Sequence, residues 1–507
     1  MSIVLGRRHV LAAVSACSLL WSAIAGASAG DRFESIRQAI RDGMQEQNIP
    51  SYAVAVAQDG KIVWEEAFGW ADRERRIPAT VNTIYSLASV SKPMTGTALM
   101  TLVQAGKIDL DRPINDYLGA AKLRARVGDV NQATVRRVAN HTAGLPMHWQ
   151  FFYADEPYQQ PSLDETILHY GNIVTPPAER FTYTNLGTGL LNGIIERTSG
   201  MSFADYMRQE VFLPLGMTRS SVDIAPSLQE FVAARYGSDD LPLPFFSANH
   251  AGASGIYSSV HDVLRFGLFH LKTHRSDQKA ILSDASLDEM HRRTAERGAD
   301  FGYGVGFEVS TVAGRRWVHH SGGMDGASTI MVLLPDQNIA VVVLANKRGM
   351  RGDIPEMILS TLLHSNPPAK KPVVAKAESV CSMASTLSGV WQGTLATYEG
   401  DRSLELRFVS ADEVQVRLGD QLPTLLNRPN CDGNSFSGEF LGRIGTADTD
   451  RYRYRISVSL HLRGAALNGT ATAIHVEGRR GPAALAHWVE VRRIDTTPAH
   501  ALTSASY

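Results

Sequence analysis

The segment Ser89-Val90-Ser91-Lys92 has the residue types and the spacing that nucleophilic catalysis requires. It places a hydroxyl and an amine three residues apart, and residues at that spacing share one face of a helix. A serine hydroxyl is a weak nucleophile unless a neighbouring base takes its proton, and the amine of Lys92 is within reach to do so. If Ser89 stands at a helix N-terminus, the backbone N–H groups there would also favour a developing oxyanion.

This S-x-x-K pattern is short, and it occurs a second time as Ser276-Asp277-Gln278-Lys279. The second copy lies in a polar stretch without an apolar helix behind it, which is typical of a solvated loop. The copy at Ser89 instead precedes the largely apolar run Pro93–Met100. Catalysis at Ser89 is therefore predicted only together with other motifs.

The segment Tyr183-Thr184-Asn185 is a second candidate, directly before a predicted helix at Leu186–Thr198. A tyrosine near a lysine cation can be pushed toward phenolate and serve as a base. The Asn185 amide can hydrogen-bond both to a substrate carbonyl and to the lysine. The alternative for Tyr183 is a structural role, as a buried tyrosine whose hydroxyl is satisfied.

Residues His320-Ser321-Gly322-Gly323 form a third motif, at the end of a predicted strand, Arg316–His320. A strand edge beside the nucleophile can offer the backbone N–H of Gly323 as a second oxyanion donor, next to that of Ser89. The structural alternative is a glycine turn between two strands.

Together and in this order, the three motifs resemble the S-x-x-K, Y-x-N and K/H-x-G elements of the serine β-lactamase and penicillin-recognising hydrolase family. With tyrosine in the second motif, the chain is similar to class C β-lactamases, DD-peptidases, D-aminopeptidases and family VIII esterases. Three other segments are similar to the same family, namely His141–Pro146, Asn185–Leu191 and Ala253–Ser259. The resemblance extends over residues 33 to 363.

This resemblance implies a role for each motif residue. Ser89 would be acylated, while Lys92 and Tyr183 would shuttle protons. The substrate-binding residues would be Asn185, His320, Ser321 and Gly322, and the oxyanion hole would consist of the N–H groups of Ser89 and Gly323. No metal or cofactor is implied, and the sequence contains neither H-E-x-x-H nor C-x-x-C.

His320 departs from true β-lactamases, which usually have lysine at this position to pair with the carboxylate of the antibiotic. A neutral histidine would attract a carboxylate less strongly, so efficient β-lactam hydrolysis is not expected. The predicted activity is hydrolysis of peptides with D-amino acids, including peptides derived from peptidoglycan. Carboxylesterase and β-lactamase activity remain alternatives, as does a non-catalytic protein that binds penicillin or peptidoglycan. Because side chains alternate along a strand, His319 is expected to face the other way.

The elements around these motifs predict an α+β or mixed α/β domain. Strand patterns lie at both ends of this region and helical patterns lie between them, so one antiparallel sheet flanked by a helical region is expected. The expected elements are a helix at Asp31–Gln47, strands at Ser51–Ala57 and Lys61–Phe68, a helix from Ser89 to Ala105, strands at Gly302–Ser310, Arg316–His320, Ser328–Leu334 and Ile339–Ala345, and a helix at Asp353–Leu363.

Composition divides the 507 residues into four parts. Residues 1–29 combine Arg7-Arg8, an apolar run and an A-x-A ending, which is typical of a cleaved signal peptide. Residues 30–363 form the predicted hydrolase domain, and 364–379, rich in proline and charge, form a linker. In residues 380–507, alternating strand patterns follow a G-x-W-x-G motif at Gly389. This region is expected to form a small β-barrel, similar to the lipocalin-like barrels appended to some of these hydrolases.

The leader predicts a periplasmic or secreted protein, and Arg7-Arg8 is typical of twin-arginine export. Lipidation at Cys17 is a weaker alternative, and no segment of the mature chain is apolar enough to span a membrane. In an oxidising compartment Cys381 and Cys431 would be able to pair, and a disulfide and two separate thiols stay open as alternatives. The net charge of −1 gives no reason to expect a nucleic-acid partner.

Overall fold

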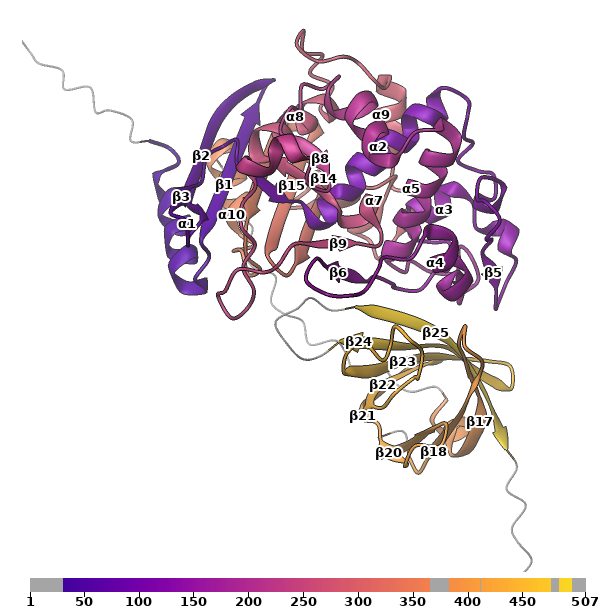
Figure 1. Cartoon of the computed structure of the whole chain (residues 1–507). Helices are drawn as coiled ribbons and strands as arrows, with labels where there is room; N and C mark the ends of the chain where they lie inside the picture. The colour runs from indigo at the N-terminus through magenta and orange to yellow at the C-terminus, as the bar shows by residue number, and fades with distance from the viewer. Residues whose placement is uncertain (1–30, 365–382, 411, 476–482, 495–507) are drawn as a thin grey trace, which may run out of the picture.

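The computed structural model describes residues 31–364, 383–410, 412–475 and 483–494. The predicted signal peptide, Cys17 and Cys381 lie outside these residues, as does the predicted linker apart from His364. Figure 1 shows a larger part of helices and strands and a smaller part made of strands. The predicted mixed α/β fold followed by an all-β barrel is confirmed. Within the described ranges, no helix is both long and apolar enough to cross a membrane.

The larger part is built on a nine-stranded antiparallel sheet with the order β11-β12-β13-β14-β15-β16-β1-β2-β3. The pairing of β1 with β16 joins the two ends of this part of the chain, with Val54 opposite Val343. Both strands are rich in Val and Ala and are almost wholly buried, as expected where a sheet is covered on both faces. The strands are β1 (Ser51–Gln58), β2 (Lys61–Asp72), β3 (Ile77–Pro78), β11 (Ala295–Glu296), β12 (Phe301–Tyr303), β13 (Glu308–Val312), β14 (Arg315–Met324), β15 (Ala327–Leu334) and β16 (Ile339–Ala345).

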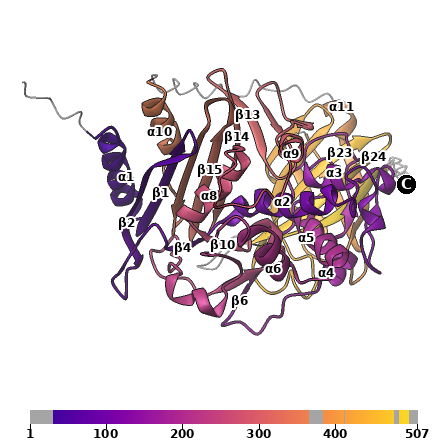
Figure 2. The ribbon, with the colours of Figure 1, turned by 90° about the horizontal axis from the view of Figure 1, so that it is seen from above.

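Helices cover both faces of this sheet. On one face, α1 (Glu34–Gln47) and α10 (Ile354–Leu362) pack together, and their apolar side chains join those of β1 and β16 in one buried cluster. The other face carries the helical region, which includes α2 (Ser91–Gln104), α5 (Asn185–Ser199) and α8 (Val260–His270). Figure 2 shows the sheet between these two layers.

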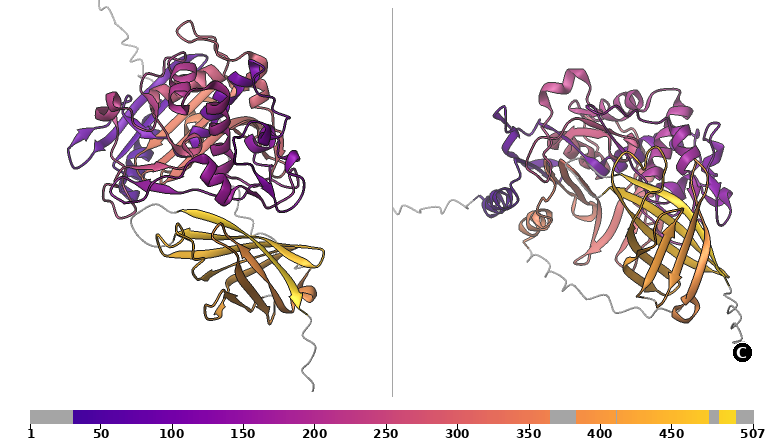
Figure 3. Two further views of the ribbon diagram at one scale, coloured as in Figure 1. Left: turned by 45° about the vertical axis from the view of Figure 1, so that its right-hand side comes forward. Right: turned by 60° about the horizontal axis from the view of Figure 1, so that its bottom comes forward.

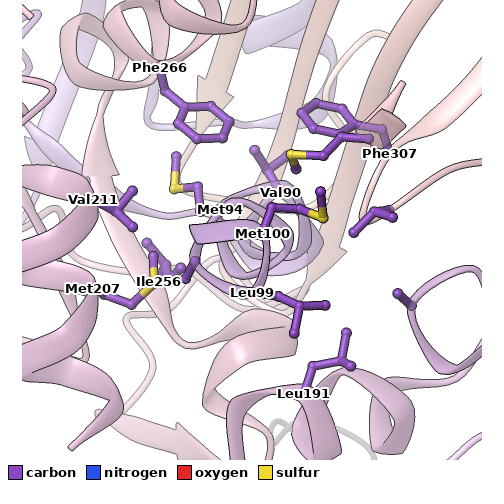
Figure 4. Close-up of a cluster of buried hydrophobic side chains, with 14 of the residues drawn as sticks. Val90, Met94, Leu99, Met100, Leu191, Met207, Val211, Ile256, Phe266 and Phe307 are labelled. Carbon is purple, nitrogen blue, oxygen red and sulfur yellow. The ribbon is translucent and has the colours of Figure 1, made fainter. Parts of the chain in front are cut away.

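Helix α2 lies at the centre of the helical region. Every residue from Ser91 to Met100 is buried, the pattern of a helix enclosed on all sides. Figure 4 shows Met94, Leu99 and Met100 of α2 among side chains of neighbouring elements, including Phe266 and Phe307. Close packing on every side fixes the helix that carries Lys92.

The remaining elements of the larger part are short. Its other α-helices are α3 (Val135–Ala139), α4 (Leu163–Tyr170), α6 (Phe203–Tyr206), α7 (Ala251–Ser254) and α9 (Asp284–Met290). The short 3-10 helices are η1 (Ala88–Val90), η2 (Ile114–Asp116), η3 (Val130–Gln132), η5 (Pro226–Phe231) and η6 (Pro335–Gln337), and η4 (Met207–Phe212) is a π-helix. Its other strands are β4 (Ile84–Ser86), β5 (Arg124–Ala125), β6 (Phe151–Tyr153), β7 (Asn172–Ile173), β8 (Ser220–Val222), β9 (Phe246–Ala248) and β10 (Ile256–Ser259).

The prediction of one strand over Gly302–Ser310 is wrong, because the chain forms two strands there, β12 and β13. Gly306 lies between them with a φ of +79°, a conformation that glycine adopts without strain. A Cβ at this position would lie 2.6 Å from the backbone oxygen of Lys92. The break therefore lets the sheet approach α2 closely.

The smaller part is a nine-stranded antiparallel sheet with the order β20-β19-β18-β17-β25-β24-β23-β22-β21, curled into a barrel. Burial alternates along its strands, as in β18, where Leu404, Leu406 and Phe408 face the core. The elements are α11 (Ala384–Leu387), β17 (Gly389–Ala396), β18 (Arg402–Phe408), β19 (Val414–Leu418), β20 (Thr424–Leu425), β21 (Asn427–Asp432), β22 (Ser435–Leu441), β23 (Tyr454–Arg463), β24 (Ala466–His475) and β25 (Ala484–Ile494).

Two sequence features of the barrel have a defined place. Trp391 of the G-x-W-x-G motif is buried in the barrel core, and its indole N–H donates to the backbone oxygen of Leu387 over 2.8 Å. Cys431 on β21 is disulfide-bonded. Cys381 lies outside the described residues.

Candidate active site

Ser89 lies in the tight turn η1, between strand β4 and helix α2. The preceding residue, Ala88, has a φ of +48°, a conformation that costs energy for any residue with a Cβ. The turn is held from behind, since the Leu87 N–H donates to the Ile256 oxygen over 2.9 Å. The turn leaves Ser89 half-buried on the wall of a cleft.

The amine of Lys92 points at Ser89 from the first turn of α2. Its Nζ lies 3.1 Å from Ser89 Oγ, 2.7 Å from Asn185 Oδ1 and 3.1 Å from the backbone oxygen of Ala253. The side chain is only 1% exposed. Three oxygen partners therefore fix the direction of the amine in a site from which water is nearly excluded.

Burial lowers the pKa of Lys92 to about 7, and the nearby Glu308 carboxyl acts in the opposite direction. A buried ammonium loses the hydration that stabilises its charge, so the fraction of neutral amine increases. Near neutral pH a large fraction of Lys92 is therefore able to accept a proton from Ser89.

Tyr183 lies beside this pair, with Lys92 Nζ 4.8 Å from the centre of its ring. Burial raises the pKa of Tyr183 well above its ordinary value, and the Ser89 side chain offsets this only in part. The prediction that the lysine pushes Tyr183 toward phenolate is therefore not supported. The reason is that the site which desolvates the lysine also disfavours a phenolate anion. In the free protein Tyr183 is a neutral phenol and a hydrogen-bond donor.

The loop that carries Tyr183 and Asn185 is held by the segment that starts at His141. The Thr184 N–H donates to His141 Nδ1 over 3.3 Å, and the Thr184 hydroxyl donates to the Pro146 oxygen over 2.7 Å. The same hydroxyl oxygen caps α5 by accepting from the N–H of Gly187. This network places Asn185 at the first position of α5, facing Lys92.

Strand β14 brings the third motif to the nucleophile. It pairs with β13 only as far as His319, whereas its pairing with β15 continues to Met324. The edge left open beyond His319 lies against the turn of Ser89, since a Cβ added to Gly322 would come within 2.9 Å of the Ser89 nitrogen. The glycine turn considered from the sequence is thus a continuing strand, and Gly323 borders the same cleft as Ser89.

The side chain of His320 does not reach the cleft. It is 1% exposed, its Nδ1 donates to the Ser321 oxygen over 2.7 Å, and its Nε2 accepts from the Tyr303 hydroxyl over 2.8 Å. Burial, with Lys92 close by, lowers the pKa of His320 to about 3, so the ring is neutral. In this structure His320 ties β14 to β12 and lies away from the surface of the cleft that substrate would contact.

His319 faces away from His320, as predicted. Its Nδ1 lies 3.3 Å from a Glu308 oxygen and its Nε2 lies 2.8 Å from the Ser310 hydroxyl. Burial raises the pKa of Glu308 to about 7, and Lys92 lowers it in part. Glu308 is therefore a second, partly buried group that titrates close to the lysine, and the sequence motifs do not indicate it.

The cleft has a volume of about 250 Å³ and is lined by polar, apolar and charged side chains. Of the predicted residues, the structure brings Ser89, Tyr183, Asn185 and Gly323 to its surface, with Lys92 directly beneath. The lining residues that the motifs did not indicate include the apolar Met147, Trp149, Phe151 and Met324 and the charged Asp325 and Arg348. A signal for the apolar wall exists in the aromatic run that follows His141–Pro146. The described residues contain no cluster of three or more side chains that would hold a metal ion.

Known proteins are similar to this chain in both sequence and fold. A family model described as Beta-lactamase matches residues 36–363. Penicillin-binding protein 4* of Bacillus subtilis is 28% identical over 315 residues, which cover 58% of this chain and 67% of that protein. Protein flp of Staphylococcus aureus is 25% identical over 321 residues, 62% of this chain and 63% of its own length. A beta-lactamase of Escherichia coli is 26% identical over 346 residues, 62% of this chain and 88% of its own.

Solved structures extend the likeness of fold. The octameric penicillin-binding protein homologue from Pyrococcus abyssi has a TM-score of 0.58 and 24% identity, and the match covers 89% of this chain and 99% of that one. A class C beta-lactamase has a TM-score of 0.57 and 20% identity, over 67% of this chain and 97% of its own. The first of these matches reaches beyond the residues of the family model and so takes in much of the barrel. From the family model and the fold, this chain belongs to the Beta-lactamase family, the group of serine hydrolases that includes the penicillin-binding proteins.

Proposed function

We propose that this protein is an exported serine hydrolase that forms an acyl-enzyme at Ser89 and cleaves peptides containing D-amino acids. The observation that carries the proposal is the amine of Lys92, 3.1 Å from Ser89 Oγ, with its pKa lowered to about 7 by burial. A base that is partly neutral at working pH and already hydrogen-bonded to the hydroxyl is what nucleophilic catalysis by serine needs.

In acylation, Ser89 Oγ attacks the carbonyl carbon of the substrate while its proton passes to Lys92 Nζ. The carbonyl oxygen gains negative charge next to the N–H groups of Ser89 and Gly323, which stabilise it. As the bond to the leaving group breaks, the proton passes through the neutral phenol of Tyr183 to the departing nitrogen. The products of this step are a free amine and an ester at Ser89.

In deacylation, a water molecule attacks the ester carbon, and one proton of the water passes through Tyr183 and Lys92 to the oxygen of Ser89. The oxygen of the water becomes part of the released carboxylic acid, and Ser89 recovers its hydroxyl. Asn185 serves both steps, because its side-chain oxygen holds Lys92 at 2.7 Å. Its amide nitrogen lies 3.8 Å from Met147 Sδ at the surface of the cleft, where a substrate carbonyl would accept from it in place of the weakly accepting sulfur.

The charges of the cleft support a peptide substrate. His320 is neutral and buried, so among the described residues that line the cleft the cation is the exposed guanidinium of Arg348, which would attract a terminal carboxylate. The carboxyl group of Asp325 also lines the cleft and interacts electrostatically with Arg348. Two similar proteins also support the proposal by their names, a penicillin-binding protein of Bacillus subtilis and a beta-lactamase/D-alanine carboxypeptidase from Pseudomonas syringae.

Carboxylester hydrolysis is the second candidate. The wall formed by Met147, Trp149, Phe151 and Met324 favours apolar acyl groups. The alcohol of an ester also leaves more readily than the amine of an amide. Hydrolysis of β-lactams would use the same acyl-enzyme and ranks third, because no lysine stands at position 320. A binding protein without turnover is the alternative from a different class.

One experiment separates these candidates. Residues 30–507 and the Ser89→Ala variant are compared on p-nitrophenyl butyrate, a D-alanyl-p-nitroanilide and nitrocefin, and both are treated with a fluorophosphonate label. We expect label and turnover in the wild type only, with the D-alanyl amide preferred. Equal rates in the two proteins would contradict catalysis at Ser89. Labelling without turnover of any substrate would favour a binding role.

Export is tested separately, by fractionating cells that express the full chain. We expect the mature protein in the periplasm or the medium, with an N-terminus near residue 30. Substitution of Arg7-Arg8 by two lysines distinguishes twin-arginine transport, which this change would block.

A further inference from the structure

The C-terminal barrel touches the wall of the cleft that holds Ser89. The backbone N–H of Trp149 donates to the backbone oxygen of Ala484 over 3.1 Å, and the backbone N–H of Ala484 donates to the backbone oxygen of Trp149 over 2.9 Å. Trp149 lines the cleft, and Ala484 is the first residue of barrel strand β25. Figure 1 and Figure 3 show β25 as the barrel strand nearest to the larger part.

The register of the barrel explains why Ala484 is free to make this pair. β25 pairs with β24 as far as Ala484, but its pairing with β17 ends at Trp488. Among the described residues, no barrel strand therefore lies beside the edge from Ala484 to His487. An open strand edge is a template for further pairing, and Trp149 occupies it.

Asp448 makes a second connection. Its carboxylate accepts hydrogen bonds from the barrel residues Tyr398 and Thr446, over 2.8 and 2.7 Å, and from the hydroxyl of Tyr170 at the end of α4. The Gln150 amide also donates to it over 3.4 Å. Burial acts to raise the pKa of Asp448, but hydrogen bonds led by that of Tyr170 bring it below the ordinary value. A charged carboxylate at the boundary thus binds to the residue next to Trp149.

The chain after Trp149 is held as well. The Arg451 guanidinium of the barrel stacks on Tyr158 and Phe152, with 4.0 and 4.7 Å to the ring centres. Tyr452 donates to a Glu156 oxygen over 2.5 Å. These contacts cover the outer side of the segment whose inner side lines the cleft, and cation–π pairs of this kind are stronger where water is excluded.

The loop that carries Tyr183 has its own barrel contacts. Arg463 at the end of β23 lies 3.0 Å from a Glu179 oxygen, and His461 is hydrogen-bonded to Arg180. Both partners stand a few residues before Tyr183 on the loop that carries it. The barrel therefore contacts two segments that supply side chains to the cleft of Ser89.

From these contacts we infer that the barrel is a specificity-determining part of the active site. It fixes residues 147–153 from outside and so sets the apolar wall against which an apolar or aromatic side chain of the substrate packs. Trp149 is then a specificity residue, and Ala484 is a positioning residue that acts through it. This inference rests on the proposed function and deepens it, because it concerns the same cleft.

The variant Ala484→Pro tests the inference in the full chain. Proline removes the N–H that donates to Trp149, yet it is tolerated where a strand N–H faces outward from its own sheet. Ala486→Pro is the matched control, since alternation puts the N–H of Ala486 on the same open edge, away from Trp149. The substrates are p-nitrophenyl acetate and p-nitrophenyl hexanoate, and hydrogen exchange of residues 147–153 is followed by mass spectrometry.

For Ala484→Pro we expect KM for the hexanoate to rise roughly fivefold, because methylene groups lose their apolar contact. We expect KM for the acetate to change less than about twofold, since its methyl does not reach the wall. Exchange of residues 147–153 should become faster, and Ala486→Pro should change neither quantity. A Ser89-dependent enzyme whose preference and exchange are unaltered in Ala484→Pro would overturn this inference alone. A wild type without Ser89-dependent turnover would overturn the proposed function, and this inference with it.

Discussion

Asn185 holds the amine of Lys92 more closely than Ser89 does, with 2.7 Å to its side-chain oxygen against 3.1 Å to the serine hydroxyl. The amide oxygen of Asn185 and the backbone oxygen of Ala253 can only accept, so together they take two N–H bonds of the lysine and leave the lone pair of the neutral amine for Ser89. The second motif of the sequence thus serves the first, because Asn185 supplies the contact that keeps the base in position.

Replacement of Lys92 tests its role as a base. We expect Lys92→Arg to lower kcat/KM for p-nitrophenyl butyrate by roughly 10³-fold, because a guanidinium keeps its charge and does not accept the Ser89 proton. Lys279→Arg, in the second S-x-x-K match, is the control and should retain the wild-type rate. Activity of Lys92→Arg close to that of the wild type would mean that the lysine supplies charge alone.

The pH dependence of the reaction follows from the same residue. Because the pKa of Lys92 is lowered to about 7, the neutral base is scarce below that pH and dominant above it. We expect kcat/KM to rise with pH up to about 7 and then to level off. Tyr183→Phe should lower kcat/KM but keep its rise with pH up to about 7, since Tyr183 stays protonated throughout the range.

Glu308→Gln separates the two groups that titrate near pH 7. The Glu308 carboxyl raises the pKa of Lys92 against the effect of burial, so its removal should move the midpoint of the profile to lower pH. If kcat/KM of Glu308→Gln no longer rises with pH up to about 7, the rise belongs to the carboxyl, which would contradict the prediction for Lys92. Steady-state rates between pH 5 and 9 provide the measurement.

Gly322 and Gly323 offer a matched pair for the approach of β14 to the nucleophile. A Cβ at Gly322 would lie 2.5 Å from the Leu87 oxygen and 2.9 Å from the Ser89 nitrogen, whereas a Cβ at Gly323 meets no atom within 4 Å. We expect Gly322→Ala to displace the strand and lower kcat roughly 10²-fold, as the loss of an oxyanion donor does.

Gly323→Ala, in contrast, should keep most of its activity. The two variants are compared by kcat and by thermal unfolding, because a general loss of stability would lower the melting temperature without a specific effect on kcat. Equal kcat values in both variants would show that the contact between β14 and Ser89 is not needed for turnover.

The parts of the site that depend on local geometry were predictable from the sequence. Ser89 and Lys92 are three residues apart, and a helical turn brings them together whatever the surrounding fold. The place of β14 was also indicated, because a buried strand ends in small residues that permit a close approach. A long apolar pattern likewise indicated β1 and β16, although it did not give their register.

The properties that come from tertiary burial were not predictable. The neutral state of Tyr183 and the hidden position of His320 both depend on elements that close over them, including Tyr303 of β12. Trp149 and Arg348 reach the cleft only because distant segments fold to its rim. No pattern of spacing connects Ala484 with Trp149, because their pairing depends on where β17 ends beside β25.

Arg348 provides the test of the substrate class. Its exposed guanidinium is the cation that lines the cleft among the described residues, and a bond to a carboxylate is a charge-assisted one. We expect Arg348→Gln to raise KM about tenfold for a peptide that ends in D-alanine with a free carboxylate. KM for the same peptide as its C-terminal amide, and for p-nitrophenyl butyrate, should be unaffected, since neither carries the charge. If the acid and the amide respond alike, the guanidinium does not bind a terminal carboxylate, and the uncharged esters favoured by the apolar wall become the better candidates for the natural substrate.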